Sequence, residues 1–406
     1  MIVYVFNNFF PDNTGFGRRC EREIKILSNI DDVVVICRKK DTSDLNEYPF
    51  ENKKIRVVRY GAKSEVVHRP EGYKSNGMYE LKRNIDVTWN LAQVLIKTLF
   101  FAKKPVQLCC VVSPLTIPLL CLVISKLLGA KSYLVSFHDL EPELAMHIKN
   151  LSPNNWLIKV ELLLEKIVCR SYKKIVVTTQ GQAEKIIERT KISASKVCVV
   201  ENSSDAKSFE EVKELQRDSK ILNDDFTLVY MSAISFDYTT ESFKKFLSDL
   251  SKKKERFNKL KILVMGDGDG LNTLKSFIEE KKLSEKVKCL GQVEQPAQIL
   301  SVADAAIIPW QQDIMTETML PTKFFEYLSF GLPLIAPAFG EFQQILTDKV
   351  NGLLFNSSSE AVDNLELLIS DKILREKISK NGFSLYKTKY LPELISKKFL
   401  EFYQSL

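Results

Sequence analysis

The sequence predicts an α/β protein with two doubly wound domains, each built on a parallel sheet covered by helices. The chain has 406 residues, more than a single hydrophobic core usually supports. Short apolar runs rich in β-branched residues alternate with longer segments of helical periodicity, as in parallel sheets. With 45% hydrophobic and 27% charged residues, the composition is that of an ordinary globular protein.

The predicted strands fall into two groups separated by a polar stretch. Residues 206–223 are rich in charge and carry no strand pattern, so we expect a linker there. A long amphipathic helix is expected over 391–406. The predicted strands span 2–6, 33–37, 55–60, 106–112, 132–137, 174–178 and 197–200 in the first group, and 226–231, 261–265, 287–290, 305–309, 334–336 and 352–355 in the second.

Composition argues against several classes of function. Eight cysteines, mostly inside apolar runs, suit reduced buried thiols of the cytosol, and no metal site is expected because zinc-ligand spacing is missing. The net charge of +7 suits an anionic partner, but the basic clusters lack the interleaved aromatics of a nucleic-acid groove. The apolar stretch 108–124 contains Pro114 and Pro118 and is bounded by Lys104 and Lys126, so we expect no membrane span there. We expect a strand followed by a helix, with Ser113 as its N-cap and Pro114 at its first position.

Ligands of doubly wound sheets bind beyond the carboxyl ends of the strands, so the loops that follow the strands are informative. The first such loop contains Gly15, Gly17, Arg18 and Arg19 ahead of a helix expected to begin near Cys20. Glycine lets the backbone approach a ligand, and arginines at a helix start attract phosphate. A flexible turn with surface arginines is the open alternative.

A second loop, directly after the predicted strand 132–137, begins with His138 and Asp139. An imidazole and a carboxylate at the end of a strand can bind sugar hydroxyls or assist proton transfer. Alternatively, Asp139 caps the helix that follows.

A third loop, Gly266-Asp267-Gly268-Asp269-Gly270, has glycines at every second position. Leu271 occupies the place where a dinucleotide-binding turn requires glycine. The spacing favours a tight strand-to-helix turn over hydride chemistry.

The most specific loop follows the predicted strand that ends at Pro309, and it leads into a helix bearing Lys323 and Glu326. Amide groups at the helix start together with Lys323 could neutralise a diphosphate, and a carboxylate can bind both hydroxyls of a ribose. An exposed surface pair of Lys323 and Glu326 is the alternative reading of the same spacing.

These residues resemble glycosyltransferase family 4, whose GT-B fold pairs two Rossmann-like domains facing a central cleft. The likeness is carried by Pro321-Thr322-Lys323-Phe324-Phe325-Glu326-Tyr327, then Gly331-Leu332-Pro333, Gly340-Glu341 and Asn351-Gly352-Leu353-Leu354-Phe355. Asp139-Leu140 with Pro142 and Glu143 further resembles a bacterial subgroup that makes capsule and O-antigen polysaccharides.

The resemblance implies a retaining hexosyltransferase that needs no metal or other cofactor and moves a sugar from a UDP-sugar, or a GDP-sugar, to a lipid-linked or saccharide acceptor. It implies an acceptor-binding domain over 1–205, joined by the C-terminal helix 386–406, and a nucleotide-sugar-binding domain over 206–385. The implied residue roles are His138 and Asp139 in catalysis, Glu317 at the donor sugar, Gly17, Arg18 and Arg19 on the acceptor side, and Gly15, Gly266, Leu320, Pro321, Thr322, Lys323 and Glu326 at the donor nucleotide and diphosphate.

Two departures from the family pattern leave alternatives open. Thr318 stands where many members have a glutamate, the nearest being Glu317, and no arginine and lysine follow the strand 226–231. The alternatives are a non-catalytic nucleotide-sugar-binding subunit and a sugar-nucleotide epimerase. The subgroup resemblance further implies a cytoplasmic protein at the inner membrane face, where Arg18, Lys103 and Lys104 are candidates to dock.

Overall fold

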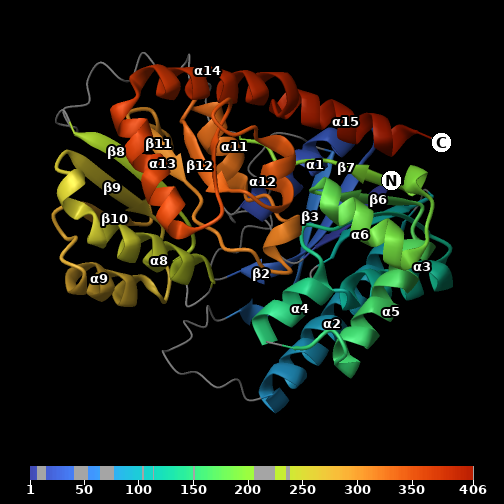
Figure 1. The fold of residues 1–406 in the computed structure, drawn as a ribbon. Coiled ribbons are helices and arrows are strands. Elements are labelled where there is room, and N and C mark those ends of the chain that lie inside the picture. The colour runs from blue at the N-terminus through green and yellow to red at the C-terminus, as the bar shows by residue number, and fades with distance from the viewer. Residues whose placement is uncertain are drawn as a thin grey trace. The chain divides into compact units, whose positions relative to one another are not determined.

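The computed structural model describes residues 1–6, 15–40, 54–64, 77–102, 105–112, 114–149, 151–204, 225–234 and 238–405. The chain forms two compact units (Figure 1). The first comprises Met1–Asn202 and Glu393–Leu406, and the second comprises Ser203–Pro392. The predicted linker 206–223 lies outside the described residues.

The first unit is built on a seven-stranded parallel sheet of order β3-β2-β1-β4-β5-β6-β7. Its strands are nearly continuous apolar runs because helices cover both faces of the sheet. They are β1 (Ile2–Phe6), β2 (Val33–Lys40), β3 (Ile55–Ser64), β4 (Gln107–Val111), β5 (Lys131–Ser136), β6 (Lys174–Val177) and β7 (Val197–Val199).

The helices of the first unit divide between the two faces of this sheet. On one face, Tyr4 of β1 donates a hydrogen bond to Glu23 of α1, and Tyr133 of β5 donates to the carbonyl of Tyr403 in α15 (2.7 Å). Helices α2, α3, α5 and α6 contribute to the core on the other face. The helices are α1 (Gly15–Ser28), α2 (Gly77–Phe100), α3 (Thr116–Leu128), α4 (Glu141–Lys149), α5 (Trp156–Ser171), α6 (Gln180–Thr190), the 3-10 turn η1 (Ala194–Lys196) and α15 (Pro392–Gln404).

The second unit has a six-stranded parallel sheet of order β10-β9-β8-β11-β12-β13. Its strands are β8 (Phe226–Met231), β9 (Leu260–Met265), β10 (Val287–Gly291), β11 (Ala305–Ile307), β12 (Leu334–Pro337) and β13 (Leu353–Phe355). Its helices are α8 (Tyr238–Lys252), α9 (Leu271–Glu280), α10 (Pro296–Leu300), α11 (Thr322–Ser329), α12 (Gly340–Ile345), α13 (Ser358–Ser370) and α14 (Lys372–Lys389), with 3-10 turns η3 (Lys254–Arg256) and η4 (Thr316–Thr318).

The predicted fold class is confirmed, but the starts of two helices were wrong. Helix α1 begins at Gly15, five residues before Cys20, so the predicted glycine-rich loop is partly its first turn. Helix α3 begins at Thr116 with Leu115 as its N-cap, two residues beyond Pro114, and Ser113 lies outside the described residues. The helix expected over 391–406 is confirmed as α15, which begins at Pro392 and belongs to the first unit.

The cysteines are thiols, most of which are buried. All eight cysteines lie among the described residues and none forms a disulfide there; six of them are buried. Burial raises the pKa of Cys37 to about 11, so this thiol stays protonated at neutral pH. Among the described residues, no helix combines the length and the apolar character needed to cross a bilayer.

The loops after β8 and β9 touch backbone to backbone, and Gly266 makes this contact sterically acceptable. Its φ is +137°, and a β-carbon added there would lie 1.7 Å from the carbonyl oxygen of Ser232. Backbone amides cross between the two loops, from Ser232 to Met265 and from Ile234 to Asp267, each at 3.0 Å. The expected tight turn is therefore confirmed, and it shapes the carboxyl edge of the sheet.

We predict that Gly266→Ala lowers the free energy of unfolding by about 3 kcal/mol or more, because the methyl group and the backbone carbonyl cannot occupy the same space. Gly291→Ala is the matched control in the same unit. Gly291 also has positive φ (+69°), but nothing lies within 4 Å of its added β-carbon. The control should lose about 1 kcal/mol in urea denaturation; equal losses in the two variants would contradict this account.

Candidate active site

The order in which the chain adds strands to the second sheet reverses at β8. From β8 the chain runs outward through β9 and β10 on one side, and later through β11, β12 and β13 on the other. The loops that follow β8 and β11 therefore diverge, and such a switch point is where doubly wound sheets bind ligands.

Lys323 joins these two diverging loops. It lies in the first turn of α11, and its Nζ donates a hydrogen bond of 3.0 Å to Oγ of Ser232, which follows β8 directly. The same ammonium lies 5.5 Å from the centre of the Tyr230 ring. An ammonium group held at the switch point is suited to binding an anion there.

The rest of α11 is fixed by burial. Phe324, Phe325 and Tyr327 are fully buried, and the Tyr327 hydroxyl accepts a hydrogen bond of 2.8 Å from the backbone amide of Met231. Lys323 and Glu326 remain half-buried on the other side of the helix. The alternative reading, in which Lys323 and Glu326 form an exposed surface pair, therefore fits poorly, because neither side chain is fully exposed.

The start of α11 presents backbone amides beside Lys323. Pro321 is the N-cap, with φ −72° and ψ 149°, and the amide of Phe324 donates to its carbonyl at 2.9 Å. Thr322 is the first helical residue, and Leu320 is buried just before the cap. Amides in the first turn of a helix have no intrahelical partners beyond the cap, so they favour negative charge.

Glu317 lies in η4, between β11 and α11, and it is half-buried. Its carboxylate accepts a hydrogen bond of 3.1 Å from Gln312, and a β-carbon at Gly340 would lie 2.3 Å from its backbone carbonyl oxygen. The adjacent Thr318 is buried. In this chain the carboxylate of η4 therefore belongs to Glu317. The family pattern has a glutamate one position later, where this chain has Thr318.

In the first unit, His138 and Asp139 follow β5, at the carboxyl edge of the sheet. Two side-chain groups hold the His138 carbonyl in place: the amide of Gln182 donates to it at 2.9 Å, and the Thr178 hydroxyl donates at 3.3 Å. Gln182 is buried and also accepts from the amide and the hydroxyl of Thr178. The ends of β5 and β6 are thereby locked together beneath His138.

Burial shifts the pKa values of this loop. Burial and the nearby Arg19 guanidinium hold the pKa of His138 well below its usual range, so the imidazole is neutral at pH 7. Burial raises the pKa of Asp139 to about 6. Burial, aided by Glu161 and Asp139 and opposed by Lys149, raises the pKa of Glu141 to about 7. Shifted acids of this kind cluster at functional sites.

Arg19 is buried rather than a surface arginine. Its Nε donates to Glu23 at 2.9 Å, and its Nη1 donates to the carbonyl of Val200 at 2.6 Å and to Asn202 at 3.2 Å. Its Nη2 has no hydrogen-bond partner among the described residues. One N–H edge of a buried guanidinium therefore remains available near His138.

Glu143 belongs to the segment Asp139–Glu143 that resembles the bacterial subgroup, and its contacts are structural. It is buried and accepts two hydrogen bonds from Arg189, at 2.8 and 3.0 Å. Arg189 also binds the buried Glu165, so one arginine joins α4, α5 and α6 through two carboxylates. Burying two carboxylates around one guanidinium is tolerable because each is hydrogen-bonded.

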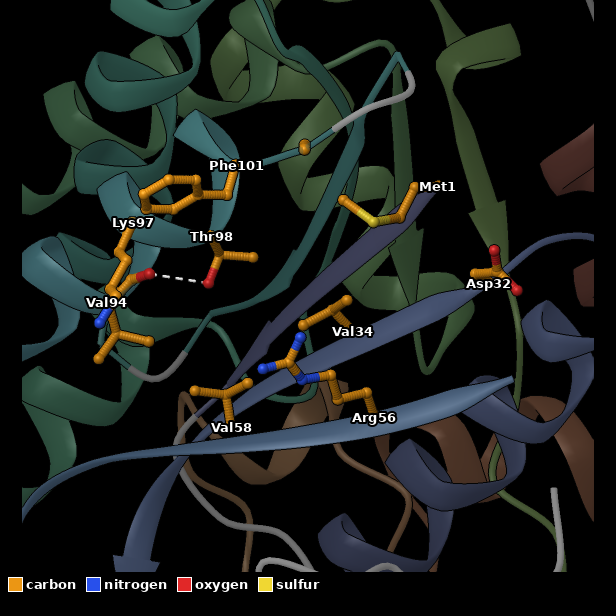
Figure 2. Close-up of a pocket in the computed structure, with 10 residues that line it drawn as sticks. Met1, Asp32, Val34, Arg56, Val58, Val94, Lys97, Thr98 and Phe101 are labelled. Atoms are coloured by element: carbon orange, nitrogen blue, oxygen red, sulfur yellow. Dashed lines mark hydrogen bonds between the residues drawn. The ribbon is translucent and has the colours of Figure 1, made fainter. Parts of the chain in front are cut away.

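A cavity of about 690 Å³ in the first unit lies away from these residues (Figure 2). It is lined by Met1, Asp32 and Arg56 near the amino ends of β1, β2 and β3, and by Lys97 and Phe101 from the end of α2. Ligands of this fold class bind at the opposite, carboxyl edge, so this cavity is not a candidate for the active site.

The remaining predicted residues fall into two groups. Gly15, Gly17 and Arg18 lie in the first turns of α1, and Gly266 lies in the turn after β9. Ser232 and Gln182 were missed, because each acts through a partner far along the chain: Ser232 and Lys323 are 91 residues apart, and Gln182 and His138 are 44 apart. A serine directly after a strand was the available signal for Ser232.

Comparisons with known proteins agree with this fold. Residues 211–384 match the family model described as Glycosyl transferases group 1. Alpha-monoglucosyldiacylglycerol synthase of Streptococcus pneumoniae is 26% identical over 170 residues, which cover 41% of this chain and 37% of that protein. The chain thus matches little more than a third of the length of this relative.

Solved structures match over nearly the whole chain. HepE of Anabaena, crystallised with UDP, is 16% identical and has a TM-score of 0.70, with 100% of both chains covered. Sucrose-phosphate synthase of Thermosynechococcus elongatus is 14% identical with a TM-score of 0.70, covering 98% of this chain and 96% of its own. The family model therefore relates residues 211–384 to group 1 glycosyltransferases, and the structural neighbours show that the whole chain has the GT-B fold.

Proposed function

We propose that the protein is a retaining glycosyltransferase that moves a sugar from a UDP-sugar to a lipid-linked or saccharide acceptor in surface polysaccharide synthesis. The observation that carries this proposal is Lys323, whose ammonium is fixed beside Ser232 at the switch point of the second sheet. A cation and a helix start at that point suit a diphosphate leaving group.

The second unit binds the donor in this proposal. Lys323 and the amides after Leu320, Pro321 and Thr322 bind the diphosphate, and Glu326 binds the ribose hydroxyls. Glu317 contacts the donor sugar, and the bare backbone of Gly266 lets the nucleotide approach. UDP and UDP-glucose were bound by the crystallised HepE, which supports a uridine nucleotide.

The first unit binds the acceptor in this proposal. His138 is neutral at pH 7 and hydrogen-bonds the sugar or the incoming hydroxyl. Asp139 accepts a hydrogen bond from the same group. Arg19, with Gly17 and Arg18 at the start of α1, contributes positive charge on the same edge. The departing phosphate itself takes the proton of the incoming hydroxyl, and the charge of Lys323 makes a metal unnecessary.

A lipid-linked acceptor is favoured because the relative from Streptococcus pneumoniae is named for a glycolipid product. Such an acceptor would locate the reaction at the cytoplasmic side of a membrane. The net charge of +7 fits an anionic membrane surface.

Incubation with a panel of UDP- and GDP-sugars should release nucleoside diphosphate when a membrane lipid extract is present, and most strongly with a UDP-sugar. Release should persist in a chelator, because Lys323 carries the neutralising charge. Nucleotide-sugar binding without release would instead favour the non-catalytic subunit, and an altered free sugar nucleotide would favour an epimerase.

Glu326→Ala should weaken UDP affinity by about tenfold to a hundredfold, because a hydrogen bond to a charged group contributes about 1.5–3 kcal/mol. Lys323→Met should lower the transfer rate more than Glu326→Ala, because the cation acts on charge that develops as the diphosphate leaves. Lys377→Met, at an exposed lysine of α14, is the matched control. Calorimetric UDP affinity unchanged by Glu326→Ala would refute the ribose contact.

Asp139→Asn should stabilise the protein above pH 6 while reducing transfer. A carboxyl whose folded pKa is raised favours the folded state only while it is protonated. Its contribution is therefore present below pH 4 and lost as the pH rises to about 6. The variant should gain about 2 kcal/mol over the wild type in unfolding experiments at pH 8 and nothing at pH 4. Full transfer activity in the variant would assign Asp139 to the structure alone.

A further inference from the structure

Helices α2, α3 and α5 lie next to one another on one face of the first sheet, and α3 contacts both of the others (Figure 1). Their inward side chains, such as Leu95, Cys121 and Val168, belong to the core of the unit. Their outward side chains are unusually apolar for a protein surface. We call this outward surface the α2–α3–α5 face.

The clearest part of this face is a stripe along α5. Trp156, Val160, Leu163 and Ile167 follow one another at intervals of four, three and four residues, which places them on one side of the helix. They are 69, 42, 57 and 40% exposed. Ile158 and Val168 on the opposite side are buried. The stripe therefore contributes nothing to the core and remains available for a partner.

The other two helices extend the apolar surface. At the end of α2, Phe100 and Phe101 are 72 and 70% exposed, and Ile96 is 46% exposed one turn earlier. On α3, Leu127 is 77% exposed and Val123 is 56% exposed. Large exposed apolar side chains that recur on three helices in contact with one another are typical of an interaction site.

The charges on this face are almost all positive. Among the described side chains of α2, α3 and α5, the acidic ones are Glu161 and Glu165; Glu165 is buried against Arg189, and Glu161 is partly buried. The basic residues are spread over all three helices: Lys97, Lys126, Lys159, Lys166 and Arg170. An apolar surface interspersed with cations is complementary to a bilayer that carries anionic headgroups.

The cavity of Figure 2 continues this surface at the end of α2. Lys97 and Phe101 line it from the helix, while Arg56 lines it from β3, with its guanidinium between Val34 and Val58 of the sheet (Figure 2). Two cations thus line the cavity together with Phe101, whose ring centre lies 5.3 Å from that of the exposed Phe100. Asp32 is the acid among the lining residues.

We propose that the α2–α3–α5 face binds the surface of a bilayer containing anionic phospholipid. Aromatic and aliphatic side chains enter the boundary between headgroups and acyl chains, and the lysines pair with lipid phosphates. A second copy of the chain fits less well, because a symmetric pairing would bring the same lysines together. Arg18 takes no part in this contact, since α1 packs on the opposite face of the sheet.

This contact would hold the enzyme where the proposed lipid-linked acceptor lies, so its biological use rests on the proposed function. The contact itself does not, because vesicle binding is measured without any sugar donor or acceptor.

The test is flotation of the full-length protein with vesicles of phosphatidylcholine alone or mixed with phosphatidylglycerol. The wild type should bind the anionic vesicles, bind neutral vesicles much more weakly, and be released by salt. The double variant Trp156→Ser with Leu163→Ser should lose most of this binding, and Lys159→Glu should lower the affinity by about tenfold or more, since each surface cation contributes about 1 kcal/mol. Ile373→Ser, at an 82% exposed position of α14 in the second unit, is the matched control.

All substituted side chains are exposed, so thermal unfolding and UDP binding should match the wild type. Vesicle binding that is unchanged in the α5 variants, or that is equal on neutral and anionic vesicles, would overturn the proposal. A dimer in sedimentation that dissociates in the α5 variants, with no vesicle binding by the wild type, would assign the face to a second copy and also overturn it.

Discussion

The close backbone contact at the carboxyl edge of the second sheet is the constraint on which the candidate donor site depends. β8 is flanked by β9 and β11, and the loops after β8 and β11 diverge at this edge. Gly266 lets the turn after β9 rest against the carbonyl of Ser232, and Gly340 lets the start of α12 rest against the carbonyl of Glu317. Small residues at both points keep side chains out of the edge and bring polar groups to it.

In the proposed function, one lysine at this edge serves where the family pattern has two basic residues. A long flexible side chain would normally be free to move, which costs entropy when it binds a ligand. Lys323 is instead held by the Ser232 hydroxyl and by the face of Tyr230, on a helix anchored by three buried aromatic residues. In the proposed function, such positioning before binding lets this single charge act on the leaving group.

The first unit separates two uses of buried arginine. Arg189 is fully engaged between Glu143 and Glu165, and it holds three helices together. Arg19 is bound on one side by Glu23 and by the backbone after β7, and an N–H of its other edge has no partner among the described residues. Its charge also lowers the pKa of His138. A buried cation that is incompletely paired is costly, which is consistent with a role at the site rather than in packing.

The sequence by itself determined the elements with a local signal. Alternating apolar runs specified the parallel strands, the glycines from Gly266 onward specified a tight turn, and the spacing of Lys323 and Glu326 put both on one side of a helix. These features follow from side-chain periodicity and backbone sterics, which act over a few residues. The start of α1 was missed because its first turn contains two glycines, whose weak helix propensity is overridden by packing.

Only the tertiary structure decided the contacts between distant segments. Ser232 meets Lys323 across 91 residues, and Gln182 supports His138 across 44, so neither pair leaves a pattern in the chain. Arginine is usually found at protein surfaces, yet Arg19 is buried and donates to the carbonyl of Val200 just after β7. Helix α5 is apolar on two sides, and periodicity cannot tell which side the sheet covers. Burial is set by what packs against a segment, and that is a property of the whole fold.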